Sequence, residues 1–171
     1  DTQNPQGIAA VFSIPYPDLP KNPQRVLILD AIREPGNMGT ILRTAGAAGA
    51  EIVLLAPGCV DPYNPKAVRS GMGAHFRVPI VEVKWYEVQA YCEKLNIYLA
   101  AGEGQTRHFD VDWTQPWALV IGNEAHGIAD EARNLQATSI SIPMSNATES
   151  LNASMAAAVI LFEAQRQRLQ S

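Results

Sequence analysis

Short segments rich in Val, Ile and Leu alternate with segments of helical spacing, and this alternation constrains the fold more than any other feature of the sequence. Neighbouring parallel strands need crossover connections, and crossover helices cover both faces of the sheet. The sequence therefore predicts an α/β fold, a mostly parallel sheet with helices on both faces. The predicted strands are Val26 to Leu29, Ile52 to Leu55, Val78 to Val83, Ile97 to Ala101, Ala118 to Ile121 and Ser139 to Ile142. The predicted helices are Met38 to Ala48, Pro65 to Gly71, Trp85 to Leu95, Asp130 to Leu135 and Leu151 to Gln167.

The length of 171 residues fits one domain. A Pro-rich stretch, Pro15 to Pro23, is typical of an extended lead-in. We therefore predict a linker over residues 1–24 and a single domain over residues 25–171. Because the chain begins at Asp1 rather than at a methionine, we also expect the parent protein to be longer.

Three classes of protein are disfavoured by composition. The longest apolar run, Met155 to Phe162, is far shorter than the roughly 20 residues that span a bilayer, so we expect no membrane partner. Cys59 and Cys92 form no CxxC pattern and no cluster with His, so neither a disulfide framework nor a metal site is predicted. No secretory leader is visible, and the cytoplasm is the expected location.

The charge balance limits how this chain can hold a nucleic acid. Lys and Arg total 13 against 17 Asp and Glu, which gives a formal net charge of -4. A broad basic surface that binds phosphates by counterion release is therefore disfavoured. Any nucleic-acid partner must be held by a local patch.

The first segment with chemical potential runs from Leu29 to Ala50. A strand leads into the turn Glu34-Pro35-Gly36, after which Asn37 is predicted to be the N-cap of a helix that carries Arg43. Arg43 fits either a solvated helix position or a contact with a phosphate or ribose. The run of small residues from Ala45 to Gly49 indicates that another element packs very close to this helix.

The second segment, Ala118 to Ile128, is a buried-type strand followed by two glycines and a carboxylate. Gly122 would let a ligand approach the bare backbone, and Glu124 could anchor a loop or bind a cation. An ordinary strand-to-helix turn with a capping acid is the alternative interpretation.

The third segment, Ile140 to Phe162, passes from a strand through a polar loop into an apolar helix. Ser150 and Asn152 lie where the helix begins, so capping explains either residue. The apolar stripe of Leu151, Met155 and Val159 is predicted to be core or a subunit interface.

Together the segments PGNMGTILRTA, IGNEAHG and IPMSNATESLNASMAAAVILFE resemble the three signature motifs of the SpoU, or TrmH-like, branch of the SPOUT RNA methyltransferases. The resemblance spans Val26 to Arg168, in the family's order and spacing. It implies methyl transfer from S-adenosylmethionine to a ribose 2'-hydroxyl in RNA. It also implies a homodimer and a C-terminal trefoil knot, which strand and helix pattern alone would not predict.

The resemblance assigns roles to particular positions. It implies that Arg43 orients the ribose and its phosphate and stabilises developing alkoxide charge, because a guanidinium is an unlikely proton acceptor. The arginine of one subunit would serve the cofactor of the other, and the dimer interface would combine 151–162 with the small-residue helix after Arg43. The implied cofactor-binding residues are Ala101, Gly122, Ile142, Met144 and Leu151, and the implied catalytic residues are Asn37, Arg43, Glu124, Ser150 and Asn152.

Asn4 to Val11 resembles the linker that follows an N-terminal RNA-binding domain in longer members of the family. This favours ribosomal RNA as the substrate over transfer RNA, with a domain of a 23S rRNA methyltransferase-like protein as the parent.

Three alternatives compete with this interpretation, two of them from other functional classes. A dinucleotide-binding oxidoreductase is disfavoured because Gly71-Met72-Gly73 and Gly102-Glu103-Gly104 both lack the third glycine of GxGxxG. A transfer-RNA methyltransferase and a catalytically silent, knotted RNA-binding dimer stay open at this stage.

Overall fold

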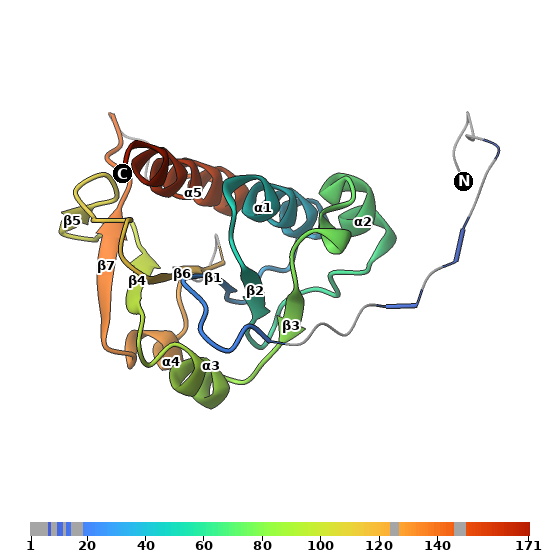
Figure 1. Cartoon of the computed structure of the whole chain (residues 1–171), viewed down its shortest axis with the longest axis horizontal. Helices are drawn as coiled ribbons and strands as arrows, with labels where there is room; N and C mark the ends of the chain where they lie inside the picture. Colours follow the sequence, from blue (N-terminus) through green and yellow to red (C-terminus); the bar gives the residue numbers. More distant parts are fainter. Residues whose placement is uncertain (1–6, 8–9, 12, 15–18, 124–126, 146–149) are drawn as a thin grey trace.

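Seven strands form one sheet in the computed structural model, and every pairing between the described strands is parallel (Figure 1). The structure describes residues 7, 10–11, 13–14, 19–123, 127–145 and 150–171. The strand order is β3-β2-β1-β6-β4-β7-β5. The strands are β1 (Arg25–Leu29), β2 (Ile52–Leu55), β3 (Ile80–Glu82), β4 (Asn96–Ala100), β5 (Thr106–Arg107), β6 (Trp117–Ile121) and β7 (Ala137–Ser141).

Helices cover both faces of this sheet, as predicted. One layer holds α1, α2 and α5 with the short 3-10 helix η1, and the other holds α3 and α4 (Figure 1). Alternate residues of β1 serve the two layers: Leu27 and Leu29 pack with α1 and α5, whereas Val26 and Ile28 pack with α3 and α4. The helices are α1 (Pro35–Ala48), α2 (Pro65–Gly71), η1 (Ala74–Phe76), α3 (Trp85–Tyr91), α4 (Asp130–Arg133) and α5 (Ala153–Gln170).

All six predicted strands and all five predicted helices are present, with shifted ends. Only β2 and α2 have the predicted bounds, and α5 begins and ends later than the periodicity indicated. The prediction missed β5 and η1, which are two and three residues long and therefore leave no periodic signal.

The start of α1 corrects the prediction for Asn37. Pro35 occupies the first helical turn, and Glu34 is the N-cap, with its carboxylate accepting from the backbone N–H of Gly36. Proline is favoured there because its missing N–H would have no partner within the helix. Asn37 therefore lies inside the first turn, where its side chain is available for other contacts.

The close approach predicted at Ala45 to Gly49 is present, since a Cβ atom added at Gly49 would lie 2.9 Å from Arg168 of α5, but the tightest approach lies earlier in the helix. A Cβ atom added at Gly39 would lie 1.9 Å from Ser70 Oγ and 2.2 Å from the carbonyl oxygen of Ala67, so α2 packs directly on the α1 backbone. The corresponding atom at Gly46 would have no neighbour closer than 3.9 Å. Gly39 is thus the position where the helix pair requires glycine.

Strand β6 joins the two halves of the sheet. It pairs with β1 on one side and β4 on the other, and all five of its residues are buried. The chain passes from β4 to β6 on one side of β4 and then returns to β7 on the other side. This return is compatible with the trefoil knot implied by the resemblance, and the knot itself stays a prediction.

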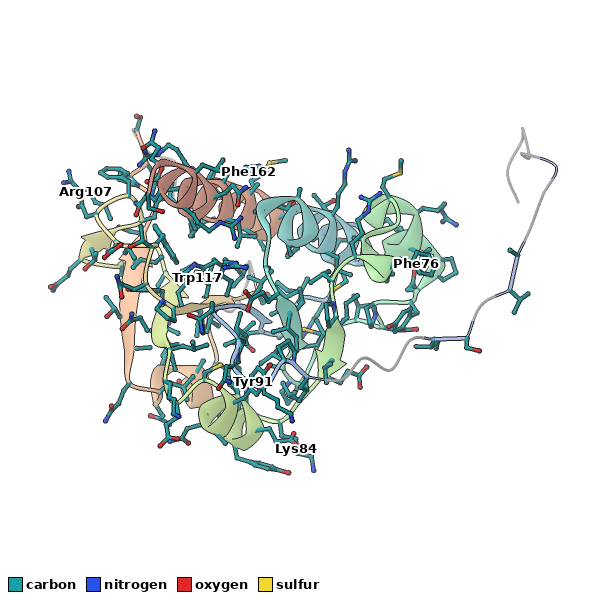
Figure 2. All side chains as sticks on the ribbon, viewed as in Figure 1. Phe76, Lys84, Tyr91, Arg107, Trp117 and Phe162 are labelled. Atoms are coloured by element: carbon teal, nitrogen blue, oxygen red, sulfur yellow. The ribbon has the colours of Figure 1, made fainter. Side chains whose placement is uncertain are left out.

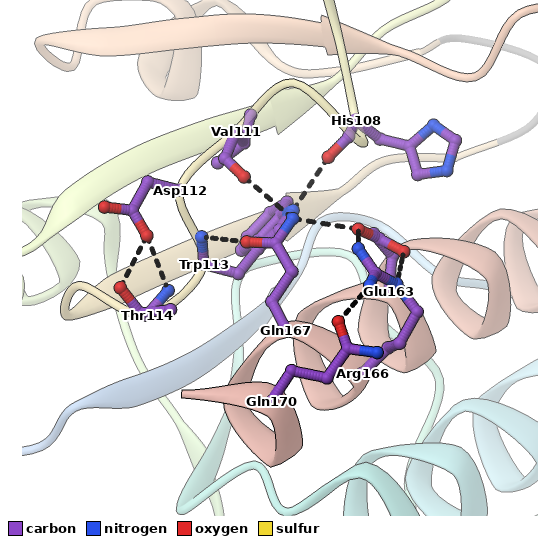
Figure 3. A network of polar contacts seen from close by, with 9 residues as sticks. All are labelled: His108, Val111, Asp112, Trp113, Thr114, Glu163, Arg166, Gln167 and Gln170. Atoms are coloured by element: carbon purple, nitrogen blue, oxygen red, sulfur yellow. Dashed lines mark hydrogen bonds and ion pairs between the residues drawn. The ribbon is translucent and has the colours of Figure 1, made fainter.

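Side-chain hydrogen bonds hold the last turns of α5 against the segment between β5 and β6 (Figure 3). The amide of Gln167 donates to the carbonyl oxygen of Val111 and accepts from the backbone N–H of Trp113, each over 3.0 Å. The same amide donates to Glu163, which also forms an ion pair with Arg166. The position of α5 therefore depends on polar contacts as well as on its buried face.

No helix within the described ranges is both long enough and apolar enough to span a bilayer.

Replacing Glu163 with Gln is expected to destabilise the protein at neutral pH by about 1 kcal/mol, or about 2–4 °C in Tm, because the Arg166 ion pair is part-exposed. The hydrogen bond from Arg166 lowers the pKa of Glu163 from 4.5 to about 2. The contribution of the Glu163 charge to the free energy of unfolding is therefore fully present above pH 4.5 and is lost as the pH falls toward 2.

Thermal unfolding of both proteins from pH 7 to pH 3 measures this effect. The Tm difference should narrow as the pH falls, and a constant difference would contradict the role of the Glu163 charge. Glu93→Gln, at an exposed position beyond α3, is the control for a neutralised surface carboxylate at pH 7.

Candidate active site

A cavity of about 410 Å³ opens where the carboxyl ends of β4, β6 and β7 meet the start of α5. Ligands of parallel α/β folds bind at this edge of the sheet, and the volume falls within the ~300–1,000 Å³ of small-molecule sites. Ile140 and Ile160 contribute apolar wall, while Glu103 and Arg133 contribute opposite charges. The cavity therefore presents both apolar and polar groups to a ligand.

All five residues predicted to bind the cofactor line this one cavity. They come from three strand ends and one helix start, and are separated by up to 50 positions in sequence. The residues are Ala101 after β4, Gly122 after β6, Ile142 and Met144 after β7, and Leu151 before α5. The fold thus brings the predicted set together, and contact of these residues with a cofactor stays a prediction.

Gly122 forms a wall of the cavity that has no room for a side chain. A Cβ atom there would lie 2.5 Å from the carbonyl oxygen of Gly127 and 2.9 Å from Ile128 Cγ1. Paired backbone hydrogen bonds between Asn123 and Gly127 hold this return of the chain, at 2.8 and 3.0 Å. Glycine at position 122 is therefore required by close approach of the backbone.

Two hydrogen bonds tie this wall to the end of β1. The buried carboxylate of Asp30 accepts from the backbone N–H of Ala129 over 2.6 Å, and the Asn123 amide donates to the carbonyl oxygen of Ala31 over 2.9 Å. Burial raises the pKa of Asp30 above its ordinary value, and the bond from Ala129 partly offsets this effect. The loops after β1 and β6 are thus held as one unit.

Sequence reasoning missed Asp30. The available signal was an acidic residue directly after the apolar strand Val26 to Leu29, at the edge where ligands bind. Glu103 and Arg133 were also missed as cavity residues, because neither belongs to the three motifs.

Two of the predicted catalytic residues meet across the first and third motifs. The amide of Asn152 donates to Asn37 Oδ1 over 3.2 Å, which links the starts of α5 and α1. Asn152 also caps α5, because its Oδ1 accepts from the backbone N–H of Ser154 over 2.9 Å. The prediction that capping explains Asn152 is confirmed, and the contact with Asn37 shows that the side chain does more than cap.

The other predicted catalytic residues are placed differently. Ser150 is exposed and lines the cavity. Arg43 is exposed on α1 and is not among the residues that line the cavity. Glu124 lies outside the described residues. Among the described residues, no group of His, Cys, Asp and Glu could hold a metal ion.

Comparisons with known proteins identify the family of this chain. The family described as SpoU rRNA Methylase matches residues 24–162. The mitochondrial rRNA methyltransferase 3 of Mus musculus is 35% identical over 226 residues, covering 98% of this chain and 54% of that protein. A 23S rRNA (uridine(2479)-2'-O)-methyltransferase of Streptomyces viridochromogenes is 38% identical over 177 residues, covering 96% of this chain and 62% of that protein.

A solved structure shows the same fold. The SpoU methyltransferase AviRb from Streptomyces viridochromogenes, in complex with AdoMet, has a TM-score of 0.83 at 36% identity, over 89% of this chain and 64% of that chain. The chain spans about half the length of the curated relatives from animals that it matches, such as the Mus musculus protein. The match over residues 24–162 and the shared fold establish that this chain belongs to the SpoU rRNA methylase family.

Proposed function

We propose that this chain is the catalytic domain of an S-adenosylmethionine-dependent RNA 2'-O-ribose methyltransferase. The observation that carries the proposal is the single cavity formed by Gly122, Ile142 and Leu151, which come from separate motifs. The relatives named as rRNA 2'-O-methyltransferases, and the AdoMet complex of AviRb, support the same reaction.

The cavity suits the cofactor in size and chemistry. Adenine needs an apolar slot with backbone donors and acceptors along its edge, which Ile142, Leu151 and the backbone at Gly122 supply. The amino and carboxylate groups of the methionine part would find opposite charges in Glu103 and Arg133 of the same cavity. When bound, the cofactor supplies an electrophilic methyl group.

The chain's own residues would position and activate the ribose. Holding the 2'-oxygen in line with the methyl carbon accounts for a large part of such a reaction. We assign Arg43 to orienting the ribose and its phosphate and to stabilising alkoxide charge, since its guanidinium stays protonated. The bond between Asn152 and Asn37 would keep the helix that carries Arg43 in register with the cavity.

A homodimer would complete the site. Arg43 does not line the cavity of its own chain, which supports a role for it at the cavity of a second copy. The side chains of Met155, Val159 and Phe162 lie on one side of α5, at helical spacing, and all three are exposed. Burial of this stripe in a subunit interface would remove apolar surface from water.

Ribosomal RNA is the proposed substrate class, because the relatives from Mus musculus and Streptomyces viridochromogenes are named for it. The cytoplasm is the proposed location for a bacterial parent protein, whereas the Mus musculus relative is mitochondrial.

Gly122→Ala should weaken S-adenosylmethionine binding by at least tenfold, about 1.4 kcal/mol, because the added methyl group displaces the cavity wall at Gly127. Calorimetric titration measures the affinity. Gly46→Ala is the matched control: it adds the same methyl group where the nearest atom is 3.9 Å away, and should leave the affinity unchanged. NAD should bind neither the wild type nor the two variants. A wild-type protein that binds NAD but not S-adenosylmethionine would contradict the proposed function.

Arg43→Ala should reduce methyl transfer to RNA by at least 100-fold, about 2.7 kcal/mol of activation free energy, while cofactor affinity is retained. Transfer of a tritiated methyl group into RNA measures the activity. Lys94→Ala, at an exposed position beyond α3, is the control.

Mixing the Arg43→Ala and Gly122→Ala proteins tests whether Arg43 acts across the dimer, at an S-adenosylmethionine concentration well below the dissociation constant of the Gly122→Ala protein, so that each variant alone is nearly inactive. If it does, each heterodimer has one site with neither defect, and mixing should restore transfer. If Arg43 serves its own chain, every site in the heterodimer carries one defect, and activity should stay absent.

Phe162→Glu should convert the dimer to a monomer, because it places a charge within the exposed α5 stripe. Sedimentation equilibrium measures the mass. Tyr86→Glu, which adds the same charge at an exposed aromatic residue of α3, should leave the dimer intact. A wild-type protein that sediments as a monomer at micromolar concentration would argue against the interface.

A further inference from the structure

Two segments of this acidic chain contain no acidic residue. Residues 35–50 and 62–81 together hold four of the 13 Lys and Arg residues and none of the 17 Asp and Glu residues. They form α1, α2 and η1, which contact one another. The four basic residues are Arg43, Lys66, Arg69 and Arg77. A local basic surface is thus present on a chain whose net charge is -4.

One side of α1 brings these cations together. Gly36, Gly39, Arg43 and Gly46 are spaced three or four residues apart, so they share one face of the helix. A Cβ atom added at Gly36 would lie 3.6 Å from Lys66 Cε of α2, and one added at Gly39 would lie 1.9 Å from Ser70 Oγ of α2. A Cβ atom added at Gly46 would lie 3.9 Å from Cβ of Arg77, the residue after η1. Arg43 is therefore on the face that meets α2 and η1, next to the turn from which Arg77 projects.

Three of these cations have no counter-charge within the part of the chain that the structure describes. Lys66 forms an ion pair with Glu34, but among the described residues no carboxylate lies within ion-pair distance of Arg43, Arg69 or Arg77. All three arginines are exposed. Their positive charge is consequently available to attract an anionic ligand from solvent.

Exposed apolar side chains lie among the same cations. Val68, Met72 and Phe76 are four residues apart, and Phe76 is 71% exposed. Met72 adopts a left-handed backbone conformation with φ of 47°, which is uncommon for a residue other than glycine. The turn that carries Met72 and Phe76 is held to the segment before α2, because buried His75 donates from Nε2 to the carbonyl oxygen of Pro62 over 2.7 Å. The aromatic ring is thus presented on a fixed support.

We propose that the surface formed by Arg69, Met72, Phe76 and Arg77 binds the single-stranded RNA next to the nucleotide whose ribose Arg43 contacts. This proposal rests on the proposed function and extends it from the reacting ribose to the flanking strand. Arginines spaced along a strand contact phosphates, and an exposed aromatic ring stacks on an unpaired base. A helical duplex offers no free base face to Phe76, so the unpaired strand is the occupant that uses both features.

A second copy of this chain fits the surface less well. In a symmetric dimer the same patch meets itself, which would bring uncompensated Arg69 and Arg77 of both copies together. The α5 stripe has apolar residues at its centre and is the better candidate for self-association.

The test compares two pairs of variants in the 171-residue chain. The first pair is Arg69→Gln with Arg77→Gln in one protein and Phe76→Ala in another. The matched pair lies at the start of α3, and Figure 2 shows Lys84 on the opposite face of the sheet from Phe76. The two variants are Lys84→Gln and Tyr86→Ala, where Lys84 Nζ lies 5.9 Å from the Tyr86 ring centroid. Tyr86 is 66% exposed, so the two aromatic residues are comparably accessible.

Fluorescence anisotropy with a labelled single-stranded RNA oligonucleotide, over a range of salt concentrations, measures the binding. The Arg69→Gln, Arg77→Gln double variant should make the slope of log affinity against log salt less steep by about 1.4, because it loses two phosphate contacts on a single strand. Phe76→Ala should weaken binding by about tenfold and leave that slope unchanged. Both α3 variants should bind as the wild type does, and all variants should bind S-adenosylmethionine normally.

Unchanged RNA affinity and slope in the first pair would overturn the surface assignment, as would equal losses in the α3 pair. Sedimentation of either first-pair variant as a monomer, where the wild type is a dimer, would instead identify a subunit interface and overturn the proposal. These outcomes leave the proposed function intact if the wild type still methylates RNA. Loss of cofactor binding or of RNA methylation by the wild type is the separate result that would reject the proposed function.

Discussion

The placement of β6 between β1 and β4 is the constraint on which the rest of this structure depends. The five residues Trp117–Ile121 are all buried, and parallel ladders satisfy their backbone groups on both sides. Because the ladders are parallel, the carboxyl ends of β1, β4 and β6 lie at one edge. The loops that follow β4 and β6 carry Ala101 and the second motif, which line one side of the cavity, and the loop that follows β1 carries the first motif.

The loops that follow β1 and β6 are held together by the buried carboxylate of Asp30. Asp30 is 2% exposed, and an ionised carboxylate at such a position is costly unless it is hydrogen bonded. The N–H of Ala129 supplies that bond and thereby attaches the loop after Gly127 to the loop of the first motif. Burial raises the pKa of Asp30 while this bond lowers it, so part of the stabilising free energy of the junction resides in a titratable contact. The cavity wall at Gly122 has little freedom as a result.

Sequence reasoning reached the architecture and the cavity residues by two different routes. Periodicity predicted strands such as Val26 to Leu29 because each is a full apolar run, but it carries no information about which strands become neighbours. The grouping of Gly122, Ile142 and Leu151 came from motif resemblance, since these residues are far apart in the chain. The cap of α1 was misassigned because Glu34 and Asn37 are both acceptable near a helix start, and only the position of Pro35 in the turn distinguishes them. Asp30 was missed because its partner is a backbone N–H 99 positions away.

The outer surface of the layer formed by α2, α1 and α5 has an apolar end and a cationic end. At one end the α5 stripe is apolar, and at the other the surface of α2 and η1 is cationic with an exposed aromatic ring. Helix α1 lies between them and contacts both α2 and α5. Arg43 faces the cationic side, while Asn37 at the start of the same helix bonds to Asn152 at the start of α5. Helix α1 therefore fixes the proposed RNA surface and the start of α5, beside the cavity, relative to each other.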